Sequence, residues 1–166
     1  MDFVKRYAPA SLALLLGACS YSFRSGALPA DVRTITILPL TNEAALVVPT
    51  LTQTLAEALR QKFITQSPLV LVATQGDLVL QGRIVEFKLA PVAIQGTQQA
   101  AQNRLSLVLH VRCTSLRYPE ISWEQSFMNF ADFPAGQSLA QVQEVLLADL
   151  CDRIAQDVVN KTLSLW

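Results

Sequence analysis

The sequence predicts an α+β domain in which two helices pack on one face of a mostly antiparallel sheet of about four main strands. Three observations lead to this prediction. Several segments alternate apolar and polar residues with the period of two that is typical of half-buried strands. Two longer segments repeat apolar residues every three to four positions, as amphipathic helices do. The segments occur in the order strand, helix, run of strands, helix, which favours two helices on the same face of the sheet.

The chain begins with the pattern of a secretory leader. An apolar run over residues 8–16 follows two basic residues and leads through Gly17 and Ala18 to Cys19. The run is about half of the ~20 residues that a membrane-spanning helix needs. The tetrapeptide Leu16–Cys19 resembles the bacterial lipobox, in which the cysteine thiolate takes up the lipid. We therefore expect a signal peptide over residues 1–18, cleavage between Ala18 and Cys19, and acylation of Cys19, where several acyl chains give stable anchoring.

The alternative for this segment is an ordinary signal peptide in which Cys19 is incidental.

Acidic residues directly after the lipidated cysteine often mark retention in the inner membrane, whereas Ser20 and Tyr21 stand here. By that analogy, we expect a lipid anchor in the outer membrane and a domain that faces the periplasm. Residues 19–31 have few periodic apolar residues and read as a tether, so the folded domain is expected over residues 32–166.

The first strand and the first helix have clear limits. Residues 32–38 alternate polar and β-branched residues, and Pro39 ends this strand. Thr50–Gln53 has the form of a capping box, which predicts a helix start. Apolar residues then recur every four positions until Ser67-Pro68 stops the helix: Leu51, Leu55, Leu59 and Phe63.

A short apolar segment, residues 69–72, is a strand candidate, and residues 74–77 read as a turn. A long strand follows over residues 78–89. Its apolar residues change parity along the strand, and this change predicts a bulge between Ile84 and Phe87.

The second half of the chain contains two further strands and the second helix. Residues 95–103 are rich in amides, lack large apolar groups and read as an exposed hairpin tip. Residues 105–113 alternate regularly between apolar and polar side chains, and residues 121–133 form the next strand, with Trp123 and Phe127 expected to pack on one face. A second capping box, Ser138–Gln141, opens the long helix, whose apolar stripe is Leu139, Val142, Leu146, Leu150, Ile154 and Val158.

Composition excludes several classes of function. The whole chain has equal numbers of basic and acidic residues and no basic cluster, which argues against a nucleic-acid binder. His110 is the only histidine, and a triad built on it would need Ser and Asp partners that the sequence does not place. No zinc-type spacing or glycine-rich phosphate loop is present. We interpret Gly82, which lies beside the predicted bulge, as a residue needed for the backbone conformation and not as part of a ligand site. We therefore expect a protein without enzymatic activity, cofactor or metal.

Two cysteines follow Cys19 in the chain. Cys113 and Cys151 could pair in the periplasm, which permits disulfides. We favour the alternative that both are small buried hydrophobic residues.

The ordered features together resemble the LptE family of lipopolysaccharide-assembly lipoproteins, over nearly the whole chain. The residues that carry the resemblance are the lipobox with Cys19, Tyr21-Ser22-Phe23, Pro29, Thr34-Ile35-Thr36-Ile37, Asn42, Pro49-Thr50-Leu51, Leu80-Gln81-Gly82-Arg83-Ile84, Pro91-Val92-Ala93-Ile94-Gln95-Gly96, Asn103-Arg104-Leu105 and Ala131-Asp132-Phe133. The chain departs from the family pattern at Ser20, where members have glycine. The resemblance implies a sheet with two helices on one side, lodged in or against the lumen of an LptD-like β-barrel. It further implies help in assembling that barrel and in delivering lipopolysaccharide to the outer leaflet.

This interpretation suggests two groups of contact residues. Arg83, Lys88, Arg104 and Arg112 are candidates for lipopolysaccharide phosphates, because guanidinium groups pair with phosphate in a bidentate manner. Ordinary solvated side chains are the alternative for each of them. Gln95, Gln98 and Asn103 are candidates for contact with the polar interior of the barrel.

The competing function is a scaffold lipoprotein that supports another envelope complex, such as a secretion pore, and an enzyme that uses His110 ranks third.

Overall fold

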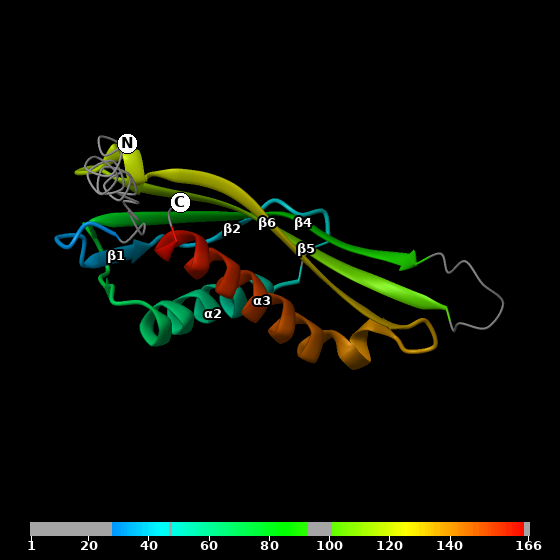
Figure 1. Cartoon of the computed structure of the whole chain (residues 1–166). Coiled ribbons are helices and arrows are strands. Elements are labelled where there is room, and N and C mark those ends of the chain that lie inside the picture. Colours follow the sequence, from blue (N-terminus) through cyan, green and yellow to red (C-terminus); the bar gives the residue numbers. More distant parts are fainter. Residues whose placement is uncertain (1–27, 47, 93–100, 165–166) are drawn as a thin grey trace, which may run out of the picture.

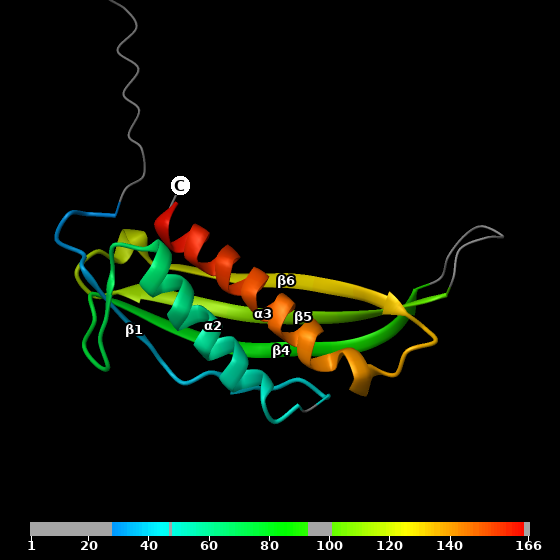
Figure 2. The same cartoon turned by 90° about the horizontal axis from the view of Figure 1, so that it is seen from below.

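The structure is a computed structural model and describes residues 28–46, 48–92 and 101–164. One sheet of six strands carries two α-helices on one of its faces (Figure 1). The elements, in chain order, are β1 Thr34–Ile37, β2 Thr41–Asn42, α2 Leu51–Gln66, β3 Val70–Leu71, β4 Leu78–Val92, β5 Gln102–Ser115, the 3₁₀ helix η2 Pro119–Ile121, β6 Trp123–Pro134 and α3 Leu139–Leu163. The view from below shows α2 and α3 side by side across the sheet (Figure 2). The predicted α+β class and the placement of both helices on one face are confirmed.

The sheet differs from the prediction in two respects: it has six strands instead of about four, and it is mixed instead of mostly antiparallel. Its strand order is β3-β1-β4-β5-β6, and β2 pairs with β4 outside this path. β1 runs parallel to both β3 and β4, and β2 runs parallel to β4, so only β4, β5 and β6 form an antiparallel meander. The physical reason is the crossover through α2, which returns the chain to the same edge so that the next strand runs in the direction of β1. The sequence did not reveal β2 as a strand, because two residues are too short to show a periodicity.

The predicted bulge in β4 is confirmed. Register with β5 is regular from Leu78 to Ile84, shifts between Ile84 and Glu86, and is regular again from there to Val92. Ile84 and Phe87 are both buried although three positions separate them. The extra residue therefore keeps the apolar side chains of both halves of β4 on the helix side.

The core lies between the sheet and the two helices. Alternate residues of β5 are fully buried and meet the apolar stripes of α2 and α3. Burial raises the pKa of the Cys113 and Cys151 thiols to about 12. Both cysteines are free, which agrees with their interpretation as small buried hydrophobic residues. Within the described ranges, no helix is both long and apolar enough to cross a membrane.

The two predicted capping boxes have different outcomes. Thr50 precedes α2 with helical backbone angles, φ −83° and ψ −15°, and its side chain makes no capping hydrogen bond, so this prediction is wrong. A cap residue normally has extended backbone angles, which aim its side chain at the free N–H groups of the first turn. Ser138 does have extended angles, and its N–H donates to Oε1 of Gln141 at 3.0 Å, as a capping box requires.

The predicted turn before β4 holds β1 in place. One oxygen of Asp77, Oδ2, accepts hydrogen bonds from the N–H groups of Arg33 and Thr34 and from the Thr34 hydroxyl, at 3.0, 3.0 and 2.7 Å. Hydrogen bonding to Thr34 and to these backbone groups lowers the pKa of Asp77. Gly76 lies against the backbone of β1, where a β-carbon would be 2.6 Å from the nitrogen of Thr36.

A candidate binding face on the open side of the sheet

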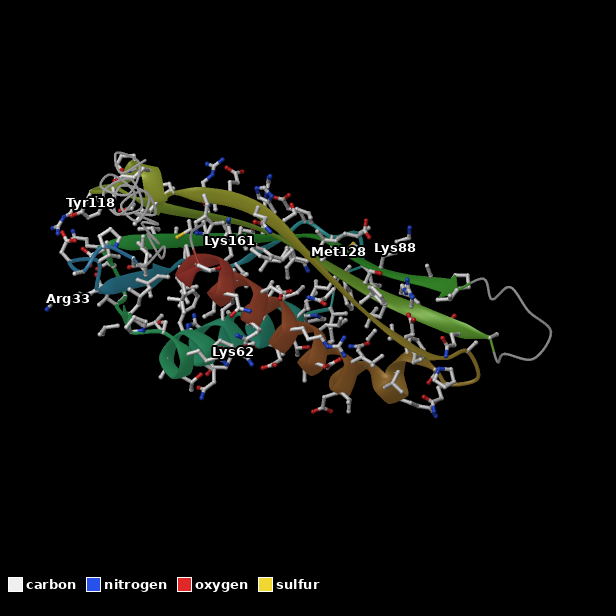
Figure 3. All side chains as sticks on the ribbon, in the orientation of Figure 1. Arg33, Lys62, Lys88, Tyr118, Met128 and Lys161 are labelled. Atoms are coloured by element: carbon white, nitrogen blue, oxygen red, sulfur yellow. The ribbon has the colours of Figure 1, made fainter. Side chains whose placement is uncertain are left out.

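The face of the sheet opposite the helices is open. Along β5, buried residues alternate with residues that are half-buried or exposed, from Arg104 to Arg112. Since side chains alternate between the two faces of a strand, the exposed set points away from α2 and α3. Lys88 of β4 lies on this side, whereas Lys62 lies on the helix side (Figure 3). All four basic residues predicted to contact lipopolysaccharide therefore share one face, which we call the open face.

A hydrogen-bonded network occupies the middle of the open face. His110 lies directly opposite Ser126, and Arg112 lies opposite Glu124, because β5 and β6 pair in register. Nε2 of His110 is 2.7 Å from Oε1 of Glu124, and its Nδ1 is 3.1 Å from the Ser126 hydroxyl. Nε of Arg112 donates to the other Glu124 oxygen at 2.7 Å. These hydrogen bonds, from Arg112 first and His110 second, lower the pKa of Glu124 to about 2.

The network brings together the residue types of a hydrolytic triad, which the sequence did not place. Ser126 and Glu124 contact opposite nitrogens of His110. A triad also needs N–H donors aimed at an oxyanion above the nucleophile. Here the three side chains project from paired strands, whose backbone N–H groups lie in the plane of the sheet. Glu124 is in addition shared with Arg112. Within the described residues, these side chains form a hydrogen-bonded polar network on the surface of the sheet.

A cleft with a volume of about 320 Å³ adjoins this network. Its lining residues come from β2 and the loop that follows it and from β4, β5 and β6: Thr41, Glu43, Gln81, Gly82, Arg83, His110, Arg112 and Glu124. A β-carbon at Gly82 would lie 2.7 Å from Cδ2 of Leu40, so a larger residue here would displace the end of that leucine side chain. The glycine also forms part of the cleft wall.

The four basic candidates differ in how freely they can bind a further anion. Arg83 and Arg112 both line the cleft, with about half of each side chain exposed. The nearest carboxylate to Arg83 is Glu43 at 3.8 Å, beyond hydrogen-bond distance. Lys88 is exposed and makes no ion pair with any residue in the described ranges.

Of the four basic residues, Arg104 is the one whose guanidinium is most fully paired with neighbouring side chains. Its Nε and Nη2 donate to the two carboxylate oxygens of Asp132 at 2.7 and 2.8 Å. Its guanidinium also lies 3.8 Å from the centre of the Phe130 ring. Hydrogen bonding to Asp132 raises the pKa of Arg104, and the same pair lowers the pKa of Asp132. Arg104 is thus already satisfied by its neighbours on β6.

Apolar side chains on the same face were missed from the sequence. Met128 and Phe130 of β6 are 65% and 43% exposed, although both are large and apolar. They alternate with buried Phe127 and Ala131, and this alternation was the signal that could have placed them on the open face. On the other side of β6, Trp123 packs edge-on against Phe127, with ring centres 5.9 Å apart, as predicted.

The remaining predicted site residues lie at or beyond the limits of the described chain. Asn103 stands at the start of β5, opposite Pro91 of β4 and Phe133 of β6. Gln95, Gln98 and Cys19 lie outside the described residues, so their predicted roles stay predictions.

The fold is similar to that of several solved bacterial proteins. One is a hypothetical protein from Chlamydia trachomatis, with a TM-score of 0.56 and 10% identity over 80% of this chain and 97% of that chain. Another is a minor lipoprotein from Acinetobacter baumannii, with a TM-score of 0.53 and 12% identity over 78% of this chain and 91% of that chain. At such low identity these similarities concern the fold alone.

Sequence comparison identifies the family. No curated protein matches the chain significantly. A family model described as "LptE: Lipopolysaccharide-assembly" matches residues 32–162, which include all six strands and both helices except the last residue of α3. The match agrees with the resemblance seen in the ordered motifs of the sequence. The chain belongs to the LptE family of lipopolysaccharide-assembly proteins.

Proposed function

We propose that the protein is a non-enzymatic outer-membrane lipoprotein that assists the assembly of an LptD-like β-barrel and the delivery of lipopolysaccharide to the outer leaflet. The match of residues 32–162 to the LptE family carries this proposal. The leader that ends in the lipobox-like segment Leu16–Cys19 supports the lipid anchor. The near-neutral charge of the chain supports the location in a polar barrel interior, where an unpaired charge would be costly.

The anchor has a direct test. Mass spectrometry of the protein purified from membranes should find cleavage before Cys19 and a lipid on its sulfur. Replacement Cys19→Ser should abolish both and release the protein from the membrane fraction. A Cys19→Ser variant that is processed identically and still partitions with membranes would show that the lipoprotein assignment is wrong.

The contact with the barrel is proposed for the end of the molecule that carries the β4–β5 hairpin. β4 and β5 extend past the helices at this end (Figures 1 and 2). Leu89, close to this end of β4, is 40% exposed, although its partner Leu105 on β5 is completely buried. Because a pair of strands is narrower than the complete domain, the projecting hairpin can enter the lumen of a barrel more easily than the domain can.

The experiment places a photo-crosslinker at Gln98, in the segment between β4 and β5, and at Gln61 of α2 as control. We expect Gln98 to crosslink to an outer-membrane barrel and Gln61 to crosslink less. Depletion of the protein should leave that barrel misassembled and the cell surface poor in lipopolysaccharide. A depleted strain with a normal barrel and normal surface lipopolysaccharide would contradict the proposal, and recovery of a different envelope complex in pull-downs would favour the scaffold alternative.

The open face is our candidate for the contact with lipopolysaccharide. Arg83 and Arg112 both line the cleft, and each keeps guanidinium N–H groups that make no strong hydrogen bond to any residue that the structure describes. Exposed Met128 and Phe130 lie farther along the same face and offer apolar contact area to lipid chains. The double variant Arg83→Gln/Arg112→Gln should weaken binding of purified lipopolysaccharide. Arg60→Gln, a similarly exposed arginine on α2, is the matched control and should bind normally. Equal affinity of both variants would remove the cleft from the proposal.

A further inference from the structure

One end of the molecule gathers four segments that are distant in the sequence. They are the stretch that leads into β1, the connection from α2 through β3 to β4, the turn from β5 through η2 to β6, and the last turn of α3 (Figures 1 and 2). Strand pairing places them together, since Thr34 lies beside Val70 and Leu78 lies beside Ser115. We call this end, residues 28–33, 67–77, 115–122 and 160–164, the tether end.

The tether end exposes large apolar side chains. Leu116 is 96% exposed in the turn after β5, and Val70 is 61% exposed on the edge strand β3. Val70 also forms part of the wall of an apolar groove with a volume of about 590 Å³. The other lining residues are Leu28, Pro29, Ala30, Val32, Arg33, Pro68 and Leu163. Among the described residues, the groove thus gathers apolar side chains in one place, which is a feature of interaction sites.

A basic group stands at the rim of the groove. Arg33 is exposed, and among the described residues its guanidinium makes only a long hydrogen bond, 3.4 Å from Nε to the carbonyl oxygen of Ala30. By contrast, Arg117 in the neighbouring turn is held by Asp31 at 3.1 Å, and Asp31 also accepts a hydrogen bond from the Tyr118 hydroxyl at 2.5 Å. Arg33 therefore remains available to an external anion such as a lipid phosphate, directly beside apolar side chains.

The tether limits how far this end can move from the membrane. Eight residues lie between Cys19 and Leu28, the first described residue, so nine Cα–Cα steps join the two. A fully extended chain of that length spans at most about 30 Å. The groove and Leu116 are thus kept within about one bilayer thickness of the lipid anchor. This step rests on the proposed lipidation of Cys19.

We propose that the tether end is a membrane-contact surface that rests on the phospholipid headgroups of the leaflet in which the chain is anchored. Leu116 and Val70 enter the interface, acyl-chain segments lie along the apolar groove, and Arg33 binds a headgroup phosphate. A single anchor would leave the domain free to swing on its tether. Contact at this end instead orients the molecule, with the β4–β5 hairpin directed away from the contacted surface (Figure 2).

The test uses the full lipidated chain in vesicles of phosphatidylethanolamine and phosphatidylglycerol. An environment-sensitive fluorophore is attached at Leu116→Cys, and at Val145→Cys as control, since Val145 is 73% exposed near the start of α3 at the opposite end. Cys113 and Cys151 are buried and should not compete for the label. We expect a blue shift and quenching by nitroxide-labelled lipids at position 116 and neither effect at position 145. Equal behaviour of the two positions would overturn the proposal.

Flotation of the same vesicles separates this proposal from that of the anchor. If the chain floats with the vesicles but position 116 gives no lipid-dependent signal, the lipid anchor is supported and the proposed contact surface is wrong. If the chain does not float, both the anchor and the contact surface are contradicted, because the proposed contact depends on the anchor. The variant Arg33→Gln should reduce the signal at position 116 severalfold, whereas Arg60→Gln, on α2, should leave it unchanged.

A label at Val70→Cys tests what occupies the groove. We expect shielding of this label from an aqueous quencher only when vesicles are present. Equal shielding with and without vesicles would show that another segment of the chain fills the groove, and it would overturn the proposed acyl-chain site.

Discussion

Glu124 illustrates how much of the open face depends on a single side chain. Its two oxygens satisfy His110 and Arg112 at once, and all three side chains project from neighbouring strands. Neither the strand pattern nor the spacing of these residues in the sequence distinguishes Glu124 from other exposed carboxylates. Only the register of β5 and β6 brings a carboxylate between the imidazole and the guanidinium.

The lowered pKa of Glu124 predicts a pH-dependent contribution to stability. The folded state favours the ionised carboxylate, whose pKa falls from its ordinary value near 4.5 to about 2. The contribution is therefore complete above about pH 5 and is lost as the pH falls from 4.5 through about 2. Urea unfolding should show Glu124→Gln to be less stable than the parent chain at pH 7, and the difference should shrink at pH 3.

Glu144→Gln provides the control for that experiment. Glu144 is exposed on α3 and has no hydrogen bond or ion pair among the described residues. The stability of this variant should follow that of the parent chain at both pH values. A Glu124→Gln effect of constant size across this range would contradict the role of the ionised carboxylate.

Gly76 permits a prediction about close backbone approach. A β-carbon at this position would lie 2.6 Å from the nitrogen of Thr36 and 2.9 Å from the carbonyl carbon of Ile35. Both atoms belong to the β1 backbone, which is paired on both sides and cannot easily move. We expect Gly76→Ala to lower the free energy of unfolding by about 1–3 kcal/mol, the usual cost of overpacking.

Gly136→Ala is the matched substitution, because a β-carbon there would meet nothing within 4 Å. Thermal unfolding should show a clearly lower melting temperature for Gly76→Ala than for Gly136→Ala. Similar melting temperatures for the two variants would mean that β1 can shift away from the turn.

At the scale of elements, β5 is the central antiparallel strand of the domain. It pairs with β4 and β6 along most of its length, and its two faces have different surroundings. Residues of one parity are packed against α2 and α3, and residues of the other parity lie on the open face. The regular alternation in the sequence predicted this division, because no bulge interrupts the strand.

Two adjacent substitutions test the parity of β5. Leu107 is completely buried, whereas Ser106 is on the open face beside Lys88 and Phe130. Leu107→Asp would bury an unpaired charge and should unfold the domain or cost about 4 kcal/mol or more. Ser106→Asp should change the free energy of unfolding by less than about 0.5 kcal/mol. Circular dichroism and thermal melting would decide, and equal tolerance of the two substitutions would reverse the assigned parity.

The helices show that the capping sequence alone is an incomplete predictor. Thr50–Gln53 and Ser138–Gln141 both have the sequence of a capping box, yet only the second forms. The difference lies in the backbone before the helix. The N–H of Leu51 already bonds to the carbonyl of Val48, which continues the helical turn backward through Thr50. Ser138 instead follows a tight turn that leaves it extended.

At the scale of the whole molecule, the helices cover only part of the sheet. The tether end is closed by the last turn of α3 and by the β3 region, whereas the β4–β5 hairpin extends beyond both helices (Figure 2). The two ends therefore offer different surfaces. The tether end is suited to a contact near the lipid anchor, and the hairpin end is suited to insertion into a partner.

This asymmetry predicts that two leucines of the same face have unequal effects on stability. Leu109 is fully buried under the helices, and Leu89 near the hairpin is 40% exposed. Leu109→Ala should lower the free energy of unfolding by about 2–5 kcal/mol, whereas Leu89→Ala should cost less than about 1 kcal/mol. Denaturant titration measures both values, and comparable losses would mean that the hairpin end is packed as tightly as the core.

The sequence by itself determined the class of the fold, the long strands, both helices, the bulge in β4 and the family. These features rest on local periodicity, breakers and ordered motifs, since the side-chain direction of neighbouring residues follows from the backbone period. Even the change of parity in β4 is local, because it compares residues only a few positions apart. The predicted roles of Cys19, Gln95 and Gln98 also arise at this level and await their experiments.

Only the tertiary structure decided the pairing of strands and therefore the composition of the open face. The parallel partners of β1, the short strand β2 and the contact of His110 with Glu124 depend on residues far apart in the chain. The free energy of such contacts comes from packing and register, which no single segment encodes. The difference between satisfied Arg104 and the freer Arg83 likewise depends on what the neighbouring strand places opposite each of them.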